Sequence, residues 1–355
     1  MPPVYHTLLT ADTEVRRIGF RHHMSKKPPI VIIHNEVAPD APEDVLDILR
    51  QSAWIADVLR EQGYEVRSLP FSIASIATQA PALQQDHSII MNLVDASPLH
   101  EDLAYLVPGI LASLQLPYTG CSLESLFLTT DKILTKRHLH AYGIATPRWL
   151  QMHTPTSNQE FTAGPWLVKP SSDDASQGID EKSLVHATEI EQVLTEMESR
   201  QKRTGRPHFA EQFIDGREFT VCLYGAADNP VAMAPYEWVF EGFEERHLPK
   251  MFTFAAKWDD SCYAFDHIVS KHAFAEEDKP LLATLQELAA SCWHACKLSG
   301  YARIDFRIDG SGKAWVLEAN GNPSFYGFFH SAAAMGIPFG EVVETIVTVA
   351  DRHKS

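Results

Sequence analysis

The chain has 355 residues, of which 45% are hydrophobic and 21% are charged, and its formal net charge is -16. This composition is typical of a globular protein, and the length allows two or three subdomains. The acidic balance argues against a nucleic-acid partner, because binding to a phosphate backbone normally requires a basic face. A single nucleotide needs only a local group of lysines and arginines, so nucleotide binding is not excluded.

No apolar run approaches the length of a membrane span, and the first residues lack the apolar core of a signal peptide. The five cysteines include no C-x-x-C pair and are expected to be reduced thiols. Cys292 and Cys296, one helical turn apart, are predicted to face the same packing layer. These features predict a cytoplasmic protein with no membrane partner.

An irregular arm is predicted for residues 1–28, and an α/β unit for residues 29–120. Short apolar runs alternate in this unit with helical patterns, which is the order of a doubly wound parallel sheet. No G-x-G-x-x-G accompanies them, so nothing indicates a dinucleotide. The predicted strands are 30–34, 65–71 and 88–95, and the predicted helices are 42–63, 72–85 and 99–114.

Two further units are predicted for residues 121–207 and 208–355. In the first, the strand WLVKP leads into a small polar loop, SSDDASQG. In the second, GREFTVCLYG is predicted to be an alternating strand after the turn at Asp215-Gly216, and a hairpin follows near the C-terminus. The predicted helices are 123–142, 188–200, 280–298 and 338–351, and the predicted strands are 166–170, 208–213, 216–225, 302–308 and 314–319.

The C-terminal hairpin carries the clearest functional signal. Arg303 and Asp305 share one face of its first strand, and Glu318 and Asn320 share one face of its second. If the turn pairs the strands in a suitable register, all four side chains project to the same side. Two carboxylates and an amide oxygen suit Mg²⁺, and the guanidinium suits a phosphoryl oxygen. For this segment alone, a hairpin with a solvated charged edge is an equally good interpretation.

Two lysines are placed like phosphate ligands. Lys169 ends the strand WLVKP directly before the small polar loop, and Lys132 lies early in a helix. Either could be an ordinary surface lysine, which is the usual position of this residue type.

The segment AEQFIDGREFTV offers a contact for a nucleotide base. Its residues Glu211 to Ile214 present backbone groups for an adenine edge and an apolar wall for its face. Glu218, after the turn, can accept hydrogen bonds from ribose hydroxyls. Taken alone, the segment is better interpreted as an ordinary hairpin with solvated glutamates.

Together, these segments resemble the ATP-grasp superfamily, and in particular the D-alanine:D-alanine ligases. The resemblance covers about residues 30–350, nearly the whole chain. The segments that carry it stand in the family's order: LPYTGCSLESLFLTTDKILTKRHLHAYGIATP, WLVKP with its loop, EQFIDGREFTV, FAAKW, and ARIDF with LEANGNP.

The resemblance implies an α/β fold of three subdomains, two of which clasp ATP between antiparallel sheets. It also implies two Mg²⁺ ions, for which Mn²⁺ can substitute, and amide formation through an acylphosphate. The loop SSDDASQG would be the mobile cover that excludes water. The implied ligands are Lys132, Lys169 and Ser176 for phosphates, Glu218 for ribose, Glu211, Gln212, Phe213 and Ile214 for adenine, and Asp305, Glu318 and Asn320 for metal; Arg303, Lys257 and Ser324 are the catalytic candidates.

The chain departs from the family pattern where the first substrate is expected. The family's acid for the substrate ammonium corresponds to Glu43 or Asp44, either of which can equally be a helix N-terminal charge. One of the family's paired serines is Ala175 here, and its tyrosine is Trp258. The family's hydrogen-bonded triad therefore cannot form in its usual way.

Further departures follow the hairpin. The family glycine that helps to hold the reacting carboxyl group is Ser324 here, whose backbone N–H remains available. His330 and Ser331 are the polar candidates for binding the second substrate. The aromatic run at 325–329 suggests an amine bulkier than alanine, although these rings could equally be core.

These observations predict an ATP- and Mg²⁺-dependent ligase that joins an amino acid or small peptide to an amine-bearing amino acid, outside standard cell-wall synthesis. A D-alanine:D-alanine ligase with a remodelled pocket is one alternative. A nucleotide-binding relative without turnover is another. A homodimer is expected from the resemblance alone.

Overall fold

The computed structural model describes residues 27–38, 40–95, 103–152, 154–155, 160–172 and 176–352. The described strands form three sheets, of three, four and six strands. The arm predicted for 1–28 lies outside the described residues up to residue 26, and so does the beginning of the helix predicted at 99–114.

The N-terminal unit contains β1 (Ile30–His34), α1 (Glu43–Glu61), β2 (Val66–Pro70), α2 (Ile73–Gln85), β3 (Ile89–Asn92) and α3 (Leu106–Ser113), and α11 (Phe339–Arg352) joins it from the end of the chain. Its sheet is parallel, in the order β2-β1-β3. Ile32 of β1 packs towards α1 and α11, whereas Ile33 packs towards α2 and α3. The predicted parallel sheet with helices on both faces is confirmed.

The central unit is an antiparallel sheet in the order β4-β7-β5-β6. It contains β4 (Trp149–Gln151), β5 (Gly164–Pro170), β6 (Leu184–Ala187), α6 (Ile190–Thr204) and β7 (His208–Gln212). One face is covered by α6, through Val193 and Met197, which pack against Trp166. Because β7 pairs with β5, the central sheet extends to Gln212, beyond the unit boundary predicted at 207.

The C-terminal sheet has the path β11-β10-β8-β12-β13, with β9 paired to β8. Its elements are β8 (Arg217–Ala226), β9 (Asn229–Ala232), β10 (Tyr236–Phe240), α7 (Phe254–Trp258), α8 (Tyr263–His267), β11 (Ile268–Lys271), α9 (Lys279–Ala295), β12 (Gly300–Ile308), β13 (Ala314–Asn320) and α10 (Tyr326–Met335). The strand predicted at 216–225 is confirmed as β8, which is central in the sheet and buried on both faces along most of its length. Val221 joins the core beneath α9, and Cys222 joins the core shared with α10 and α11.

The long helix predicted at 123–142 is two helices, α4 (Leu123–Thr130) and α5 (Lys132–Ala141). Asp131 separates them with extended backbone angles, and its carboxylate accepts hydrogen bonds from the amides of Ile133 and Leu134. This N-cap makes Lys132 the first residue of a new helix. Apolar periodicity continued through the break, so the pattern alone did not reveal it.

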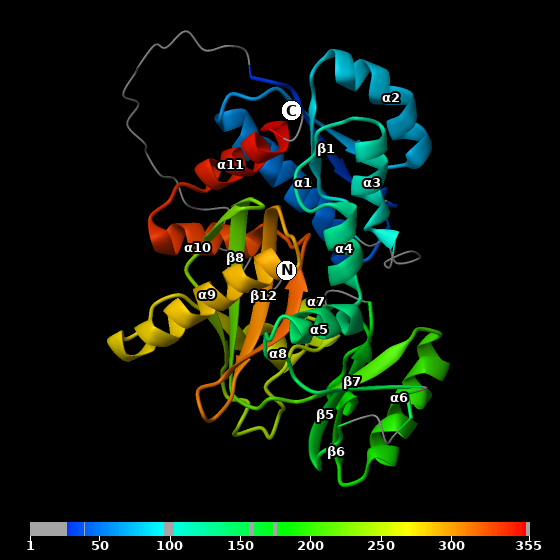
Figure 1. Ribbon diagram of the computed structural model, residues 1–355, viewed down its shortest axis with the longest axis vertical. Helices are drawn as coiled ribbons and strands as arrows, with labels where there is room; N and C mark the ends of the chain where they lie inside the picture. The colour runs from blue at the N-terminus through cyan, green and yellow to red at the C-terminus, as the bar shows by residue number, and fades with distance from the viewer. Residues whose placement is uncertain are drawn as a thin grey trace.

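The segment read most simply as a hairpin, AEQFIDGREFTV, joins two different sheets, since β7 and β8 do not pair with each other. In Figure 1 the green central sheet with α6 lies at the lower right, and α9, β8 and β12 lie to its left. The predicted shared layer of Cys292 and Cys296 is confirmed. Within the described residues no single helix is long and apolar enough to cross a bilayer, and only the bent pair Tyr326–Met335 and Phe339–Ala350 meets that test jointly.

Candidate active site

A cavity of about 370 Å³ lies where the three sheets face one another. This volume falls within the usual range for a small-molecule site. The lining comes from α1, from β5 and β7 of the central sheet, and from β8, β12 and β13 of the C-terminal sheet. Of the predicted site residues, all except Glu43, His330 and Ser331 line it.

The register of β12 and β13 brings together the residues predicted to bind metal and the arginine beside them, which we call the metal group: Arg303, Asp305, Glu318 and Asn320. Arg303 lies opposite Asn320, and Asp305 lies opposite Glu318. An irregularity in the pairing follows directly after Asp305, at the end of this charged stretch. The interpretation of the hairpin as a solvated edge is wrong, because these side chains line the cavity.

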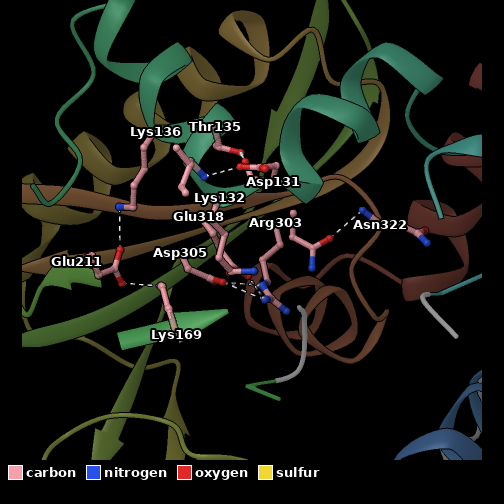
Figure 2. Close-up of polar contacts among 12 residues, drawn as sticks. Asp131, Lys132, Thr135, Lys136, Lys169, Glu211, Arg303, Asp305, Glu318 and Asn322 are labelled. Carbon is pink, nitrogen blue, oxygen red and sulfur yellow. Dashed lines mark hydrogen bonds and ion pairs between the residues drawn. The ribbon is translucent and has the colours of Figure 1, made fainter. Parts of the chain in front are cut away.

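The guanidinium of Arg303 lies between the two carboxylates. Its Nη2 atom is 2.9 Å from Asp305 Oδ2 and 3.1 Å from Glu318 Oε1. The hydroxyl of Thr220 donates to the other oxygen of Asp305, at 2.7 Å. Figure 2 shows Arg303 beside Asp305 and Glu318. The position of each carboxylate is therefore fixed by hydrogen bonds before any ligand binds.

The two carboxylates have different electrostatic environments. Burial raises the pKa of Asp305, an effect that the charge of Arg303 only partly offsets. Burial also opposes ionisation of Glu318, but the positive charges of Lys132 and Arg303 lower its pKa to about 2. Glu318 is therefore ionised at any physiological pH.

The donor set fits a magnesium–nucleotide complex rather than an all-protein metal site. Within the described residues no group of three or more His, Cys, Asp and Glu side chains could hold a metal. Asp305 and Glu318 supply two carboxylates, and Asn320 supplies an amide oxygen on the same cavity wall. Mg²⁺ commonly binds through one or two carboxylates and completes its shell with water and substrate phosphates.

Lys132 faces this group from the N-terminal end of α5. Its Nζ is 3.9 Å from Glu318 Oε2, and its side chain is only 8% exposed. The backbone N–H of Lys132 donates to the carbonyl of Ser171, which follows the strand that carries Lys169. Because the helix breaks at Asp131, Lys132 lies at the N-terminus of a new helix and lines the cavity. In the single long helix that was predicted, Lys132 would have been in the middle.

A buried carboxylate links two lysines on the central side of the cavity. Glu211 Oε2 is 2.8 Å from Lys136 Nζ, and Glu211 Oε1 is 2.5 Å from Lys169 Nζ (Figure 2). Lys136 also donates to the hydroxyl of Thr146, at 2.8 Å. Burial opposes ionisation of Glu211, but the two lysines lower its pKa; burial also lowers the pKa of Lys136. Glu211, whose backbone was predicted to contact adenine, therefore uses its side chain in a charge network with Lys169, a predicted phosphate ligand.

The other predicted base and ribose residues also line the cavity. Gln212 is the last residue of β7, and Phe213 and Ile214 follow it. Glu218 Oε2 is 2.7 Å from Arg307 Nη2, and burial raises the pKa of Glu218. Of the polar loop predicted as a cover, residues 173–175 lie outside the described part of the chain, whereas Ser176 is at the cavity wall.

Lys257 and Trp258 belong to α7, which begins at the N-cap Thr253. Burial lowers the pKa of Lys257, with a further contribution from the charge of Arg303. The charges of Asp305, Glu318 and Glu218 act in the opposite sense. Both Lys257 and Trp258 line the cavity.

Of the acidic residues in the first turns of α1, one faces solvent and two line the cavity. Glu43 is paired with Arg50 on the outside, its side chain 61% exposed. Asp44, Asp47 and Gln51 line the cavity, as expected for helix positions i, i+3 and i+7. Burial raises the pKa of Asp47, whose carboxylate accepts from the hydroxyl of Tyr326 at 3.4 Å.

The segment after the hairpin is hydrogen-bonded both to the N-terminal unit and to the strands β12 and β13. Asn322 donates to the carbonyl of Val94, at 2.9 Å, and accepts from the hydroxyl of Tyr301, at 2.7 Å. The backbone N–H of Asn322 donates to the side chain of Asn320, at 2.9 Å. These hydrogen bonds position the segment between Asn320 and Ser324, and Ser324 lines the cavity.

The residues proposed for a second substrate are not at the cavity. Ser331 is fully buried and donates to the carbonyl of Ala234, at 3.1 Å. His330 packs beside His272, with ring centroids 5.6 Å apart. The bulky-amine interpretation of the aromatic run is wrong, because these rings are core: Tyr326 stacks on Trp54, and Phe325 and Phe328 are fully buried.

Several residues of the site were not identified from the sequence: Asp47, Gln51, Arg307 and Asn322 line the cavity, and Lys136 pairs with Glu211, which lines it. Lys136 lies one helical turn after Lys132, and Arg307 lies two residues after Asp305, so period alone could have placed both on the right faces. Asp47 has the same relation to Asp44. Gln51 and Asn322 had no such signal, because their positions depend on contacts between distant segments.

Comparison with known structures identifies the fold. A D-alanine–D-alanine ligase from Bacillus anthracis, solved in complex with ATP, superposes with a TM-score of 0.67 at 18% identity, covering 92% of this chain and 99% of that one. The ligase from Coxiella burnetii gives a TM-score of 0.64 at 18% identity, with 93% and 95% coverage. The fold is therefore that of the ATP-grasp ligases.

Sequence comparison specifies the family. The family model described as D-ala D-ala ligase C-terminus matches residues 139–348. The uncharacterized protein y4sG of Sinorhizobium fredii is 30% identical over 252 residues, 70% of each chain. A D-alanine–D-alanine ligase of Cupriavidus necator is 29% identical over 252 residues, 69% of this chain and 71% of the relative. The chain belongs to the D-alanine–D-alanine ligase family.

Proposed function

We propose that the protein is an ATP- and Mg²⁺-dependent ligase that joins the carboxylate of an amino acid or small peptide to the amine of another. The observation that carries this proposal is the register of β12 and β13. It places Asp305 opposite Glu318, and Arg303 between their carboxylates, on the wall of a cavity that Lys132 faces from the other side.

The proposed reaction has two transfers. A carboxylate oxygen of the first substrate attacks the γ-phosphorus of ATP, and the bond to the β–γ bridging oxygen breaks to release ADP. The amine of the second substrate then attacks the acyl carbon, loses a proton and expels inorganic phosphate. Both transfers require positioning and neutralisation of charge rather than a protein nucleophile.

Each charged group has a part in this scheme. When bound, Mg²⁺ would be held by Asp305, Glu318 and Asn320, where it supplies electrostatic stabilisation of the transferring phosphoryl group. Lys132 and Lys169 contact the phosphates, and Arg303 neutralises the charge that develops on the transferred group. Lys257 orients the acid substrate or the acylphosphate, together with the backbone N–H of Ser324.

The acidic wall contributed by α1 supports an amino acid as one substrate. Asp44 and Asp47 face the cavity from consecutive turns of the helix. An ammonium group between them would have its charge neutralised and its donors satisfied. Trp258 offers an indole where a phenol would complete the family's triad, which supports a substrate other than the one used by a standard D-alanine–D-alanine ligase.

Two alternatives remain open to experiment. The relative from Cupriavidus necator bears the name D-alanine–D-alanine ligase, so a ligase of that specificity with a remodelled pocket is the runner-up. A nucleotide-binding relative without turnover is the other. The complete set of Arg303, Asp305, Glu318 and Asn320 at the cavity supports catalysis, because a protein that only bound nucleotide would not need all four.

A phosphate-release screen tests the proposal. The purified protein is incubated with ATP, Mg²⁺ and pairs of D- and L-amino acids, and the products of active pairs are identified by mass spectrometry. We expect release above the ATP-only background for at least one pair, with one dipeptide formed per phosphate. If ATP binds but no pair stimulates release, the amino-acid ligase assignment fails. Activity only with paired D-alanine would establish the runner-up.

A further inference from the structure

A buried arginine has no role in the scheme above. It lies at the nucleotide end of the cavity, by which we mean the part lined by Phe213, Glu218 and the strands β12 and β13. Arg307 is in β12, two residues beyond Asp305, and is only 3% exposed. Burying a guanidinium is unfavourable unless its charge is paired and its donors are satisfied. The contacts of Arg307 therefore indicate what this position is built to hold.

The contacts of Arg307 join three parts of the nucleotide end. Its Nη2 atom pairs with Glu218 Oε2 at 2.7 Å and also donates to the carbonyl of Lys250, while Nη1 donates to the carbonyl of Gly216 at 3.1 Å. The guanidinium carbon lies 5.1 Å from the ring centroid of Phe213, in the segment predicted to contact adenine. The side chain is held in one geometry by all of these contacts.

The strand register places the pair between the expected positions of base and phosphates. Arg307 lies opposite Glu218, and the next cross-strand pair on the same face is Asp305 opposite Thr220, at the metal group. Two residues of strand span about 7 Å, the scale of one sugar ring. Glu218 therefore lies between Phe213 and the metal group, where the ribose of a nucleotide bound at both ends must pass.

The two oxygens of Glu218 are differently placed. Oε2 is held by Arg307, whereas the described residues provide no hydrogen-bond partner for Oε1. Glu218 lines the cavity, so this second oxygen is available to a ligand. A carboxylate in this position accepts hydrogen bonds from hydroxyl groups.

We propose that Arg307 is a positioning residue for the nucleotide, which fixes one oxygen of Glu218 so that the other receives the ribose hydroxyls. The inference rests on the proposed ATP-dependent function and adds a residue through which the sugar is recognised. Without Arg307, Glu218 would be a buried carboxylate without its main partner, free to turn and more readily protonated.

The test compares the affinity for ATP with the affinities for 2′-deoxy-ATP and 3′-deoxy-ATP, measured by isothermal titration calorimetry in Mg²⁺ on the full chain. We expect the wild-type protein to bind ATP about tenfold more tightly than the weaker-binding deoxy analogue, as a hydrogen bond to a charged group predicts. In Arg307→Met this ratio should fall to about threefold or less. Arg307→Lys, which keeps the charge but loses the fork of donors, should give an intermediate ratio.

The matched control is Arg217→Met. Arg217 is also an arginine of the C-terminal sheet, paired with Glu237 at 2.7 Å and Asp278 at 2.6 Å, but it is not part of the cavity lining. Its replacement should leave the ATP-to-deoxy-ATP ratio unchanged. A general structural effect would weaken ATP and its analogues equally, so the ratio separates positioning from stability.

The outcomes are distinguishable. A wild-type ratio in Arg307→Met, or in Arg307→Lys if the methionine variant does not fold, overturns the proposal, as does a wild-type protein that binds ATP and both analogues equally. A wild-type protein that binds none of them overturns the proposed function as well. If the ratio falls as expected while no amino-acid pair releases phosphate, the role of Arg307 stands and the ligase assignment fails.

Discussion

The nucleotide end of the cavity and its α1 end are built in different ways. At the nucleotide end, positive and negative side chains are already paired with one another, as in the contacts of Arg303 with Asp305 and Glu318. At the α1 end, Asp44 and Asp47 bring two carboxylates to the wall, and the positive partner of Asp47, Arg50, lies at the longer distance of 4.0 Å. The first arrangement is organised before any ligand binds, whereas the second gains most of its stabilisation from the charge of the ligand itself.

This difference explains why the two ends respond differently to mutation. Removing a charge at the nucleotide end disrupts a network in which each group holds its neighbours. Removing a charge at the α1 end changes one contact to one substrate. Four predictions, in order of decreasing effect, test this contrast.

The largest effect is expected at the metal group. Glu318→Gln removes a proposed metal ligand and should lower Mg²⁺-dependent phosphate release by about 10³-fold, because several kcal/mol of transition-state stabilisation are lost. The free energy of unfolding in urea should fall by about 2 kcal/mol or less, because Arg303 keeps Asp305 as a partner. A stability loss comparable to the loss of activity would instead assign Glu318 a structural role.

A stability effect is expected for the buried charge network. Lys136→Met leaves Glu211 with one of its two lysine partners and should lower the free energy of unfolding by about 3 kcal/mol. The matched control is Lys202→Met, which removes an exposed helical pair with Glu198 and should cost about 0.5 kcal/mol or less. Equal losses in the two variants would show that burial of the Lys136 pair does not matter.

A smaller and more selective effect is expected on the α1 side. Asp47→Asn should raise the KM of the acid substrate about tenfold and leave the KM of ATP unchanged, since one charge-assisted contact is weakened. Glu43→Gln should leave both values unchanged, because Glu43 faces solvent and pairs with Arg50. A change in the KM of ATP in Asp47→Asn would mean that the two ends are not separable.

The smallest effect is expected outside both ends. Burial, together with His330, lowers the pKa of His272 to about 4. The unfolded chain therefore binds this proton at higher pH than the folded chain, so stability falls as the pH is lowered from about 6.5 towards 4. Urea midpoints across this range should fall less steeply for His272→Asn than for the wild-type protein. Parallel curves would exclude a contribution from His272.

The sequence predicted the site best where local geometry decides the outcome. The faces of Arg303, Asp305, Glu318 and Asn320 follow from strand alternation alone, and the register then brought them together. The parallel N-terminal sheet followed from the order of its apolar runs. In both cases, the prediction depended only on residues that are close together in the sequence.

The predictions failed where distant segments decide the outcome. The aromatic run after the hairpin became core because Trp54 of α1 and Phe339 of α11 pack around it, and nothing within the run indicates these partners. The buried position of Lys136 depends on Glu211, which is far along the chain. The break at Asp131 was missed because one capping side chain outweighed a continuous apolar pattern.

The position of Arg303 has a consequence for the order in which ligands arrive. With its charge between Asp305 and Glu318, the free protein does not present two bare carboxylates to a passing cation. A divalent ion that arrives alone must compete with the guanidinium, whereas one that arrives with a triphosphate provides the arginine with new anionic oxygens. With the proposed function, metal and nucleotide would therefore bind cooperatively, and each would increase the affinity for the other by the same factor.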